Sequence, residues 1–93
     1  MSTIVETETL EDVLEEVGIS NEKQIILYND DINTFAHVMK CLMKYCKHNS
    51  LQAEQCSLIV HTTGKAQVKK GGYDTIKPIC EALTENGLDA KIE

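Results

Sequence analysis

Apolar residues first gather at Gln24–Tyr28, where the run Gln-Ile-Ile-Leu-Tyr is typical of a buried β-strand. The next residues, Asn29–Asp31, have side chains that bond to nearby backbone, so they end strands and form turns. From Phe35 to about Lys47 the apolar positions change to helical spacing and form one stripe. The stripe consists of Phe35, Val38, Met39, Leu42, Met43 and Cys46. The pattern predicts a strand, a turn and a helix capped by Asn33 or Thr34.

A second helical segment is expected from Leu51 to about Thr63, with Gly64 as the residue that ends it. Its inner face is predicted to consist of Ala53, Cys56, Ile59, Val60 and Thr63. A short strand over Ala66–Lys69 and a turn at Gly71-Gly72 follow.

A third helix is predicted over Tyr73–Asn86, with Ile76, Ile79, Cys80 and Leu83 facing inward. Pro78 lies within this pattern and either kinks the helix or marks its true start. Gly87 ends the helix, and Leu88–Glu93 alternates as a last strand.

The predicted order β-α-α-β-α-β indicates a single small α+β domain: a three-stranded antiparallel sheet with helices packed on one face. We divide the chain into a flexible acidic N-terminal extension, residues 1–22, and a folded core, residues 23–93. A short helix over Leu10–Val17 is an alternative for part of the extension, but its high charge and small apolar surface favour a solvated tail.

Charge is distributed unevenly along the 93 residues. Seven acidic residues and no basic residue precede Lys23, whereas nine lysines and eight acids make the rest nearly neutral. The chain has no arginine, whereas proteins that bind nucleic acid concentrate lysine and arginine on one face, so we expect no nucleic-acid binding. It has no apolar run long enough to span a membrane and no secretory signal pattern, so we expect a cytoplasmic protein.

The four cysteines lie at apolar positions of predicted helices and form no C-x-x-C pair, so we interpret them as buried, reduced thiols. His37 and Cys41 have a spacing compatible with two metal ligands, but no second pair completes a tetrahedral set. We therefore predict no metal site and no cofactor.

Polar residues that commonly carry function follow the first strand and end the second helix: Asn29, Asp30, Asp31 and His61. Each has a structural alternative: an acidic turn also caps helices, and a single histidine is more often a surface residue than a ligand. No nucleophile motif or phosphate-binding loop accompanies them, so we expect a protein that is not an enzyme.

The runs Leu27–Thr34, Val60-His61 and Gly64-Lys65-Ala66, in this order and spacing, resemble the ClpS adaptor family, as does the tail Leu83–Glu93. The resemblance covers about residues 23–93. It implies an adaptor that binds the free N-terminal hydrophobic residue of a substrate (Leu, Phe, Tyr or Trp) and delivers it to a Clp AAA+ unfoldase-protease. The implied partner is the N-terminal domain of a ClpA- or ClpC-like unfoldase.

By resemblance, the substrate amino group is held by Asn29, Asp31 and His61, with Asp30 in the same motif. The implied hydrophobic pocket consists of Ile32, Asn33, Phe35, Val38, Ser57, Val60 and Leu88. Asp74 matches an acidic residue of the unfoldase-docking surface. The sequence departs from the family pattern at Asn33-Thr34-Phe35, where relatives commonly have Thr-Pro-Met, and at Ser57, where Met is frequent.

A different class of protein also fits part of the sequence. A non-enzymatic interaction domain resembling the C-terminal domain of the ribosomal stalk protein would bind a protein partner through a helix face. Lys40, Lys44 and Lys47 offer a basic stripe for this alternative, which leaves Asn29, Asp31 and His61 without a role.

Overall fold

The computed structural model describes residues 22–93, which fold as a small α+β domain. Its elements are β1 (Glu22–Tyr28), α2 (Phe35–Tyr45), α3 (Ser50–Thr63), β2 (Lys65–Gly72), α4 (Tyr73–Glu85) and β3 (Asp89–Ile92). The predicted order β-α-α-β-α-β is confirmed. The predicted extension, residues 1–22, lies outside the described residues except for Glu22, which begins β1.

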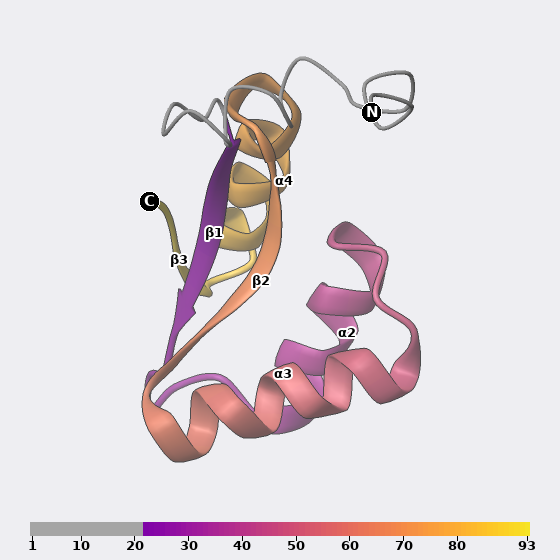
Figure 1. The fold of residues 1–93 in the computed structure, drawn as a ribbon. Helices are drawn as coiled ribbons and strands as arrows, with labels where there is room; N and C mark the ends of the chain where they lie inside the picture. The colour runs from indigo at the N-terminus through magenta and orange to yellow at the C-terminus, as the bar shows by residue number, and fades with distance from the viewer. Residues whose placement is uncertain (1–21) are drawn as a thin grey trace, which may run out of the picture.

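The strands form an antiparallel sheet in the order β2-β1-β3, so β1 lies in the middle (Figure 1). Three consecutive residues of β1, Ile25–Leu27, are buried, which explains their continuous apolar sequence. Tyr28 lies opposite Lys65 of β2 and Asp89 of β3. The chain that follows Tyr28 therefore leaves the sheet beside the point where α3 ends and β2 begins.

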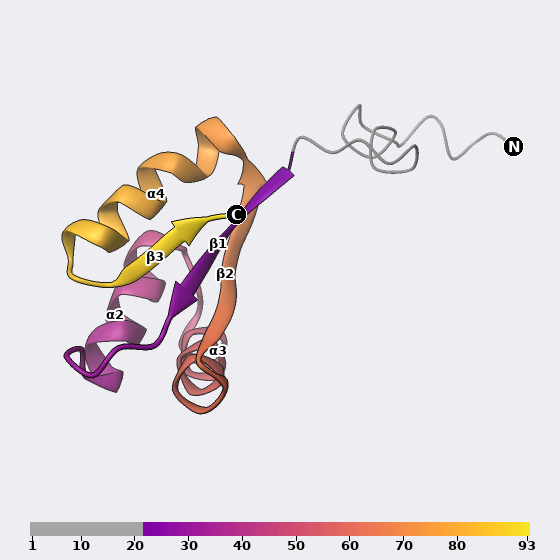
Figure 2. The same cartoon turned by 90° about the vertical axis from the view of Figure 1, so that its left-hand side faces the viewer.

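The helices lie on one side of the sheet and past one of its ends (Figures 1 and 2). Helix α4 contacts all three strands, α2 contacts α4, and α3 crosses the end of the sheet where β1 finishes. The sheet and all three helices contribute to one core, which consists of Ile25, Leu27, Cys41, Leu42, Cys46, Ala53, Val60, Val68, Ile76, Cys80, Leu83 and Leu88. This core fixes the end of β1 against α3, which is where the candidate site lies.

The prediction of a turn at Gly71-Gly72 is wrong. Both glycines belong to β2 and pair with Lys23 and Glu22 of β1, and α4 begins directly at Tyr73. Glycine is common in turns, but here the pairing with β1 continues the strand to its last residue. Pro78 lies inside α4 rather than at its start.

The predicted inner face of α3 is partly wrong. Ala53, Ser57 and Val60 are its buried residues, whereas Ile59 is 45% exposed. Apolar residues occur on more than one side of this helix, so periodicity alone does not identify the side that packs against the core. Because α3 crosses the end of the sheet, only the narrow stripe with spacing i, i+4, i+7 is covered.

Candidate functional site

The candidate site is assembled where the end of β1 meets the end of α3. Gly64 ends α3 with φ of +99°, a left-handed conformation that glycine adopts without strain. The Gly64 carbonyl accepts a hydrogen bond of 2.9 Å from the Asn29 backbone N–H. This bond brings Asn29, just after β1, to the last turn of α3, which carries His61.

Asp30 shapes the turn between β1 and α2. Its Oδ1 accepts hydrogen bonds from the backbone N–H groups of Ile32 at 2.9 Å and Asn33 at 2.8 Å, and its Oδ2 accepts one from Asn33 Nδ2 at 2.9 Å. The hydrogen bonds from Asn33, first the backbone one, lower the pKa of Asp30 below its ordinary value of 3.8. Asn33 Nδ2 also donates to the Gly87 carbonyl at 2.8 Å, which ties the turn to the connection between α4 and β3.

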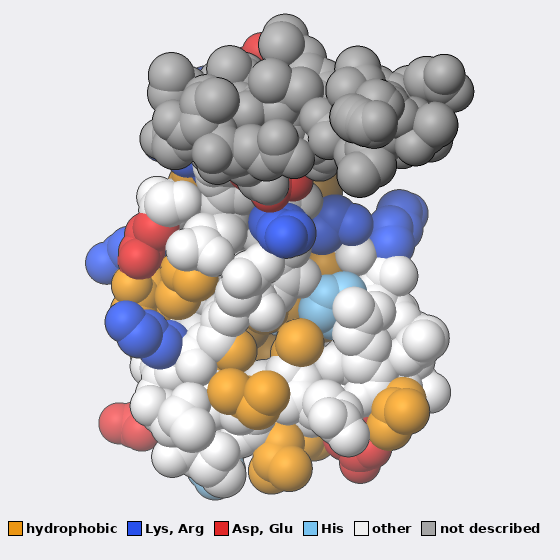
Figure 3. All heavy atoms as spheres, viewed as in Figure 1, with side chains coloured by type: hydrophobic (Ala, Val, Ile, Leu, Met, Phe, Trp, Pro, Cys, Tyr) orange, Lys and Arg blue, Asp and Glu red, His pale blue; other side chains and the backbone are white. Residues whose placement is uncertain are grey.

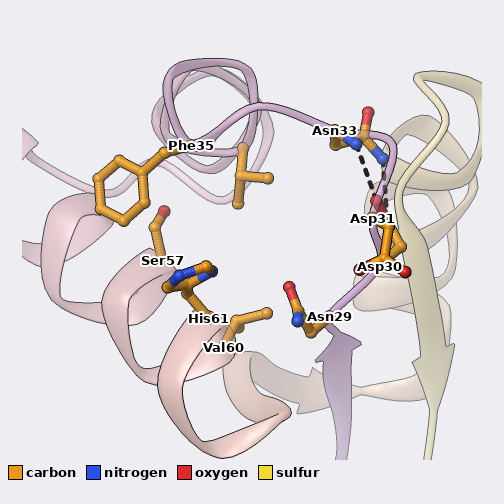
Figure 4. Close-up of a pocket in the computed structure, with 9 residues that line it drawn as sticks. Asn29, Asp30, Asp31, Asn33, Phe35, Ser57, Val60 and His61 are labelled. Carbon is orange, nitrogen blue, oxygen red and sulfur yellow. Dashed lines mark hydrogen bonds between the residues drawn. The ribbon is translucent and has the colours of Figure 1, made fainter.

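Between this turn and the helices lies a cavity of about 340 Å³ (Figure 4). Its lining residues are Asn29, Asp30, Asp31, Asn33, Phe35, Val38, Ser57, Val60 and His61. Figure 4 shows Phe35, Ser57 and His61 across the cavity from the Asp30–Asn33 turn, with Asn29 directed into the space between them. All nine were among the site residues predicted from the sequence.

The cavity has two chemically distinct parts. Asn29, Asp31 and His61 supply an amide, a carboxylate and an imidazole, and all three residues are exposed. Within residues 22–93 none of these three side chains makes a hydrogen bond or ion pair. The remaining wall is mainly apolar, with Val38 half-buried and Val60 only 4% exposed. The cavity therefore presents open polar groups beside an apolar surface.

Three other predicted site residues lie elsewhere. Ile32 is 88% exposed and does not line the cavity. Leu88 is buried in the core and lines a smaller void of about 20 Å³, which shares Val38 and Val60 with the cavity. Asp74 lies in the first turn of α4 and is exposed.

The sequence did not predict that Gly87 contributes to the site. Gly87 lies far along the chain from the turn and was expected only to end a helix, whereas its carbonyl anchors Asn33. The spacing of Asp30 and Asn33 is the local signal for such a turn, since Asp and Asn side chains bond backbone two or three residues away. The link to Gly87 has no local signal.

Among the described residues, no group of three or more His, Cys, Asp or Glu side chains is arranged to hold a metal ion. His37 Nε2 instead donates to the Asn86 carbonyl at 2.9 Å. The four cysteines are free, and all but the half-buried Cys56 are buried. Burial raises the pKa of Cys46 to about 11, so its thiol stays protonated at neutral pH.

Comparison with known proteins relates the chain to one family. The family described as "ATP-dependent Clp protease adaptor protein ClpS" matches residues 20–91. The ATP-dependent Clp protease adapter protein ClpS of Thermosynechococcus vestitus is 39% identical over 66 residues, which cover 70% of this chain and 70% of that protein. The chloroplastic adapter protein CLPS1 of Chlamydomonas reinhardtii is 34% identical over 71 residues, which cover 75% of this chain and 44% of that protein.

A solved structure has the same fold. Agrobacterium tumefaciens ClpS2 bound to L-phenylalaninamide superposes with a TM-score of 0.68 at 20% identity, covering 78% of this chain and 98% of that one. No helix within residues 22–93 has the length and apolar content that crossing a membrane requires.

Proposed function

The chain belongs to the ClpS family of ATP-dependent Clp protease adaptors, and from this premise we propose that its cavity binds the free N-terminal residue of substrate proteins. The preferred first residues are the bulky hydrophobic ones, Leu, Phe, Tyr and Trp. The bound protein is then delivered to a Clp AAA+ unfoldase-protease for degradation. An adaptor holds its substrate without reacting with it, so we assign no catalytic residue.

The chemistry of a free N-terminus matches the polar part of the cavity. An α-amino group has an ordinary pKa of about 7.7–8.0, so at neutral pH it is largely a cation with three N–H donors. Asn29 Oδ1, the Asp31 carboxylate and a ring nitrogen of His61 are three acceptors that line one cavity and lack partners within the described residues. Charge-assisted hydrogen bonds of this kind contribute roughly 1.5–3 kcal/mol each.

Asp30 has a different role in this proposal. Both of its carboxylate oxygens are already engaged within the turn. We therefore assign it to positioning Asp31 and Asn29 rather than to contact with the substrate amine.

The apolar part of the cavity accepts the first side chain. Burial of a Leu or Phe side chain contributes roughly 1.5–3 kcal/mol, and about 340 Å³ is within the range of pockets that enclose small ligands. Val38, Val60, Phe35 and Ser57 form this wall. The phenylalaninamide bound by Agrobacterium tumefaciens ClpS2 has the same two features, a free amino group and a large apolar side chain.

Delivery requires a second surface. Asp74 is exposed on α4 and does not line the cavity, so a partner bound there leaves the substrate residue in place. We propose that this part of α4 docks the N-terminal domain of a ClpA- or ClpC-like unfoldase.

The proposal rests on one observation: an apolar wall and three amine acceptors, which have no partner within residues 22–93, line the same cavity. The test is fluorescence anisotropy with a labelled Phe-initiated peptide and its N-acetylated twin, which lacks the charged amine. We expect only the free peptide to bind, and Asp31→Ala and His61→Ala each to weaken binding at least tenfold.

Asp74→Ala is the matched control for these substitutions, because it removes an exposed carboxylate outside the cavity. It should leave peptide affinity unchanged, and circular dichroism should report an intact fold for all three variants. Equal binding of the free and acetylated peptides would refute the assignment of the amine site.

A further inference from the structure

A second hollow, with a volume of about 350 Å³, lies between the α2–α3 connection and β2. Its polar lining consists of Lys47, His48, Gln52, Gln67, Lys69 and Lys70, and none of its lining residues is acidic. Figure 3 shows lysine side chains gathered around a histidine on this face of the molecule. We call this hollow the lysine groove. It shares no residue with the cavity described above.

Positive charge in the lysine groove is only partly compensated. Lys69 Nζ donates to the Cys46 carbonyl at 3.3 Å, and Lys70 Nζ lies 3.9 Å from Glu22 Oε1. The pair between Lys70 and Glu22 is the only ion pair within residues 22–93. Lys47 has φ of +61°, a left-handed conformation that is unfavourable for a residue with a Cβ. Within the described residues, the three lysines of the hollow thus have one carboxylate partner, that of Glu22.

His48 lines the lysine groove as well, and its side chain is buried. It is 7% exposed, and its Nε2–H donates to the Val68 carbonyl at 2.7 Å. Nδ1 has no partner among the described residues, and a buried nitrogen without a hydrogen bond is unfavourable. Because Nδ1 is itself buried, an occupant of the groove meets the lysines rather than this nitrogen, and carboxylates are the groups that pair with lysines.

We propose that the lysine groove binds the acidic N-terminal segment of this same chain, residues 6–16. The segment contains Glu6, Glu8, Glu11, Asp12, Glu15 and Glu16 and no basic residue. Its charge is therefore complementary to the groove.

The connection to β1 brings the segment within reach. Glu22 pairs with Gly72 in the sheet, and Lys70 is two residues away along β2, about 7 Å in a strand. The six residues from Glu16 to Glu22 extend to roughly 20 Å at most. The acidic side chains of residues 6–16 thus reach the lysine groove without crossing the peptide cavity. When docked, they are unavailable to other partners, whereas the peptide cavity remains accessible to substrate.

The test is a comparison of ¹H–¹⁵N NMR spectra of full-length variants. In the first variant the six acids become amides, through Glu→Gln at positions 6, 8, 11, 15 and 16 and Asp12→Asn. We expect backbone signals of residues 47–52 and 67–70 to move and those of residues 29–38 to stay. In the natural protein, NaCl raised to about 0.5 M should produce the same movement, because salt screens exposed charges.

A reciprocal pair of variants identifies the groove. Lys47→Gln with Lys70→Gln should move the signals of residues 6–16, whereas the matched pair on α2, Lys40→Gln with Lys44→Gln, should not. Equal effects of the two pairs would mean diffuse attraction and overturn the proposal, as would shifts in the first variant confined to the altered segment. If inorganic phosphate moves the groove signals equally in the natural protein and the first variant, the groove is a site for free anions and the proposed occupant is wrong.

Discussion

The residue at position 57 should control how strictly the cavity rejects β-branched first residues. Ser57 is 3% exposed and lines the cavity from α3, with Phe35 and Val38 of α2 lining it as well. The Ser57 side chain is short, and its hydroxyl has no hydrogen-bond partner within the described residues. In the proposed binding mode, the small Ser57 side chain leaves space beside the Cβ of the bound residue, and a longer side chain would close that space.

Ser57→Met fills that space with a flexible thioether. An Ile- or Val-initiated peptide needs room for a second γ-carbon, whereas a Leu-initiated peptide does not. A methyl-sized difference in a pocket is worth about 1–3 kcal/mol, and we take the lower end because Met can adjust its rotamer. The preference for Leu over Ile should accordingly rise by about fivefold in Ser57→Met.

Competition of Leu-, Ile- and Val-initiated peptides against one labelled peptide measures this ratio. Ser57→Ala is the matched control, because it removes the hydroxyl and adds no bulk. It should leave the Leu-to-Ile ratio unchanged and should not destabilise the protein, since the buried hydroxyl has no bond to lose. The reasoning fails if Ser57→Met does not change the ratio, or if Ser57→Ala changes it as much.

Two further predictions concern the turn and α4. Asp30→Ala removes three hydrogen bonds at a solvent-open site, contributing together about 1 kcal/mol, and should lower Tm by roughly 4–8 °C. Because the pKa of Asp30 is lowered, the full difference in Tm between the natural protein and Asp30→Ala should be present above pH 3.8 and should narrow as pH falls further. Thermal melts at several pH values measure this difference. Pro78→Ala should raise the free energy of unfolding in urea by about 1–3 kcal/mol, because proline cannot donate within α4, and an unchanged value would mean that the helix has adapted to it.

Features encoded by neighbouring residues were predictable from the sequence. The apolar run of β1, the α2 helix and the glycine that ends α3 each combine a local pattern with a known backbone preference. The predicted apolar stripe of α2 is only partly buried, since Phe35 and Met43 are each 41% exposed. The nine residues that line the cavity were predicted from the resemblance to the family, although the apolar ones among them are equally typical of core.

The predictions that were wrong or missing concern features that depend on contacts between residues far apart in the sequence. Gly71 and Gly72 continue β2 because β1 pairs with them, and the buried side of α3 is chosen by the end of the sheet. The bond from Asn33 to Gly87 joins residues 54 positions apart. No pattern within a short window contains that information.

The hydrogen bond from the backbone N–H of Asn29 to the Gly64 carbonyl joins the two halves of the site through backbone atoms alone. The spacing of Asn29 and His61 thus does not depend on which side chains form the cavity wall. Phe35 and Ser57, in contrast, lie on the helices α2 and α3. If the cavity binds N-terminal residues as proposed, evolution can exchange these two residues to alter the accepted first amino acid while the proposed amine-binding groups keep their positions. A library randomised at positions 35 and 57 should then yield binders for different N-terminal residues.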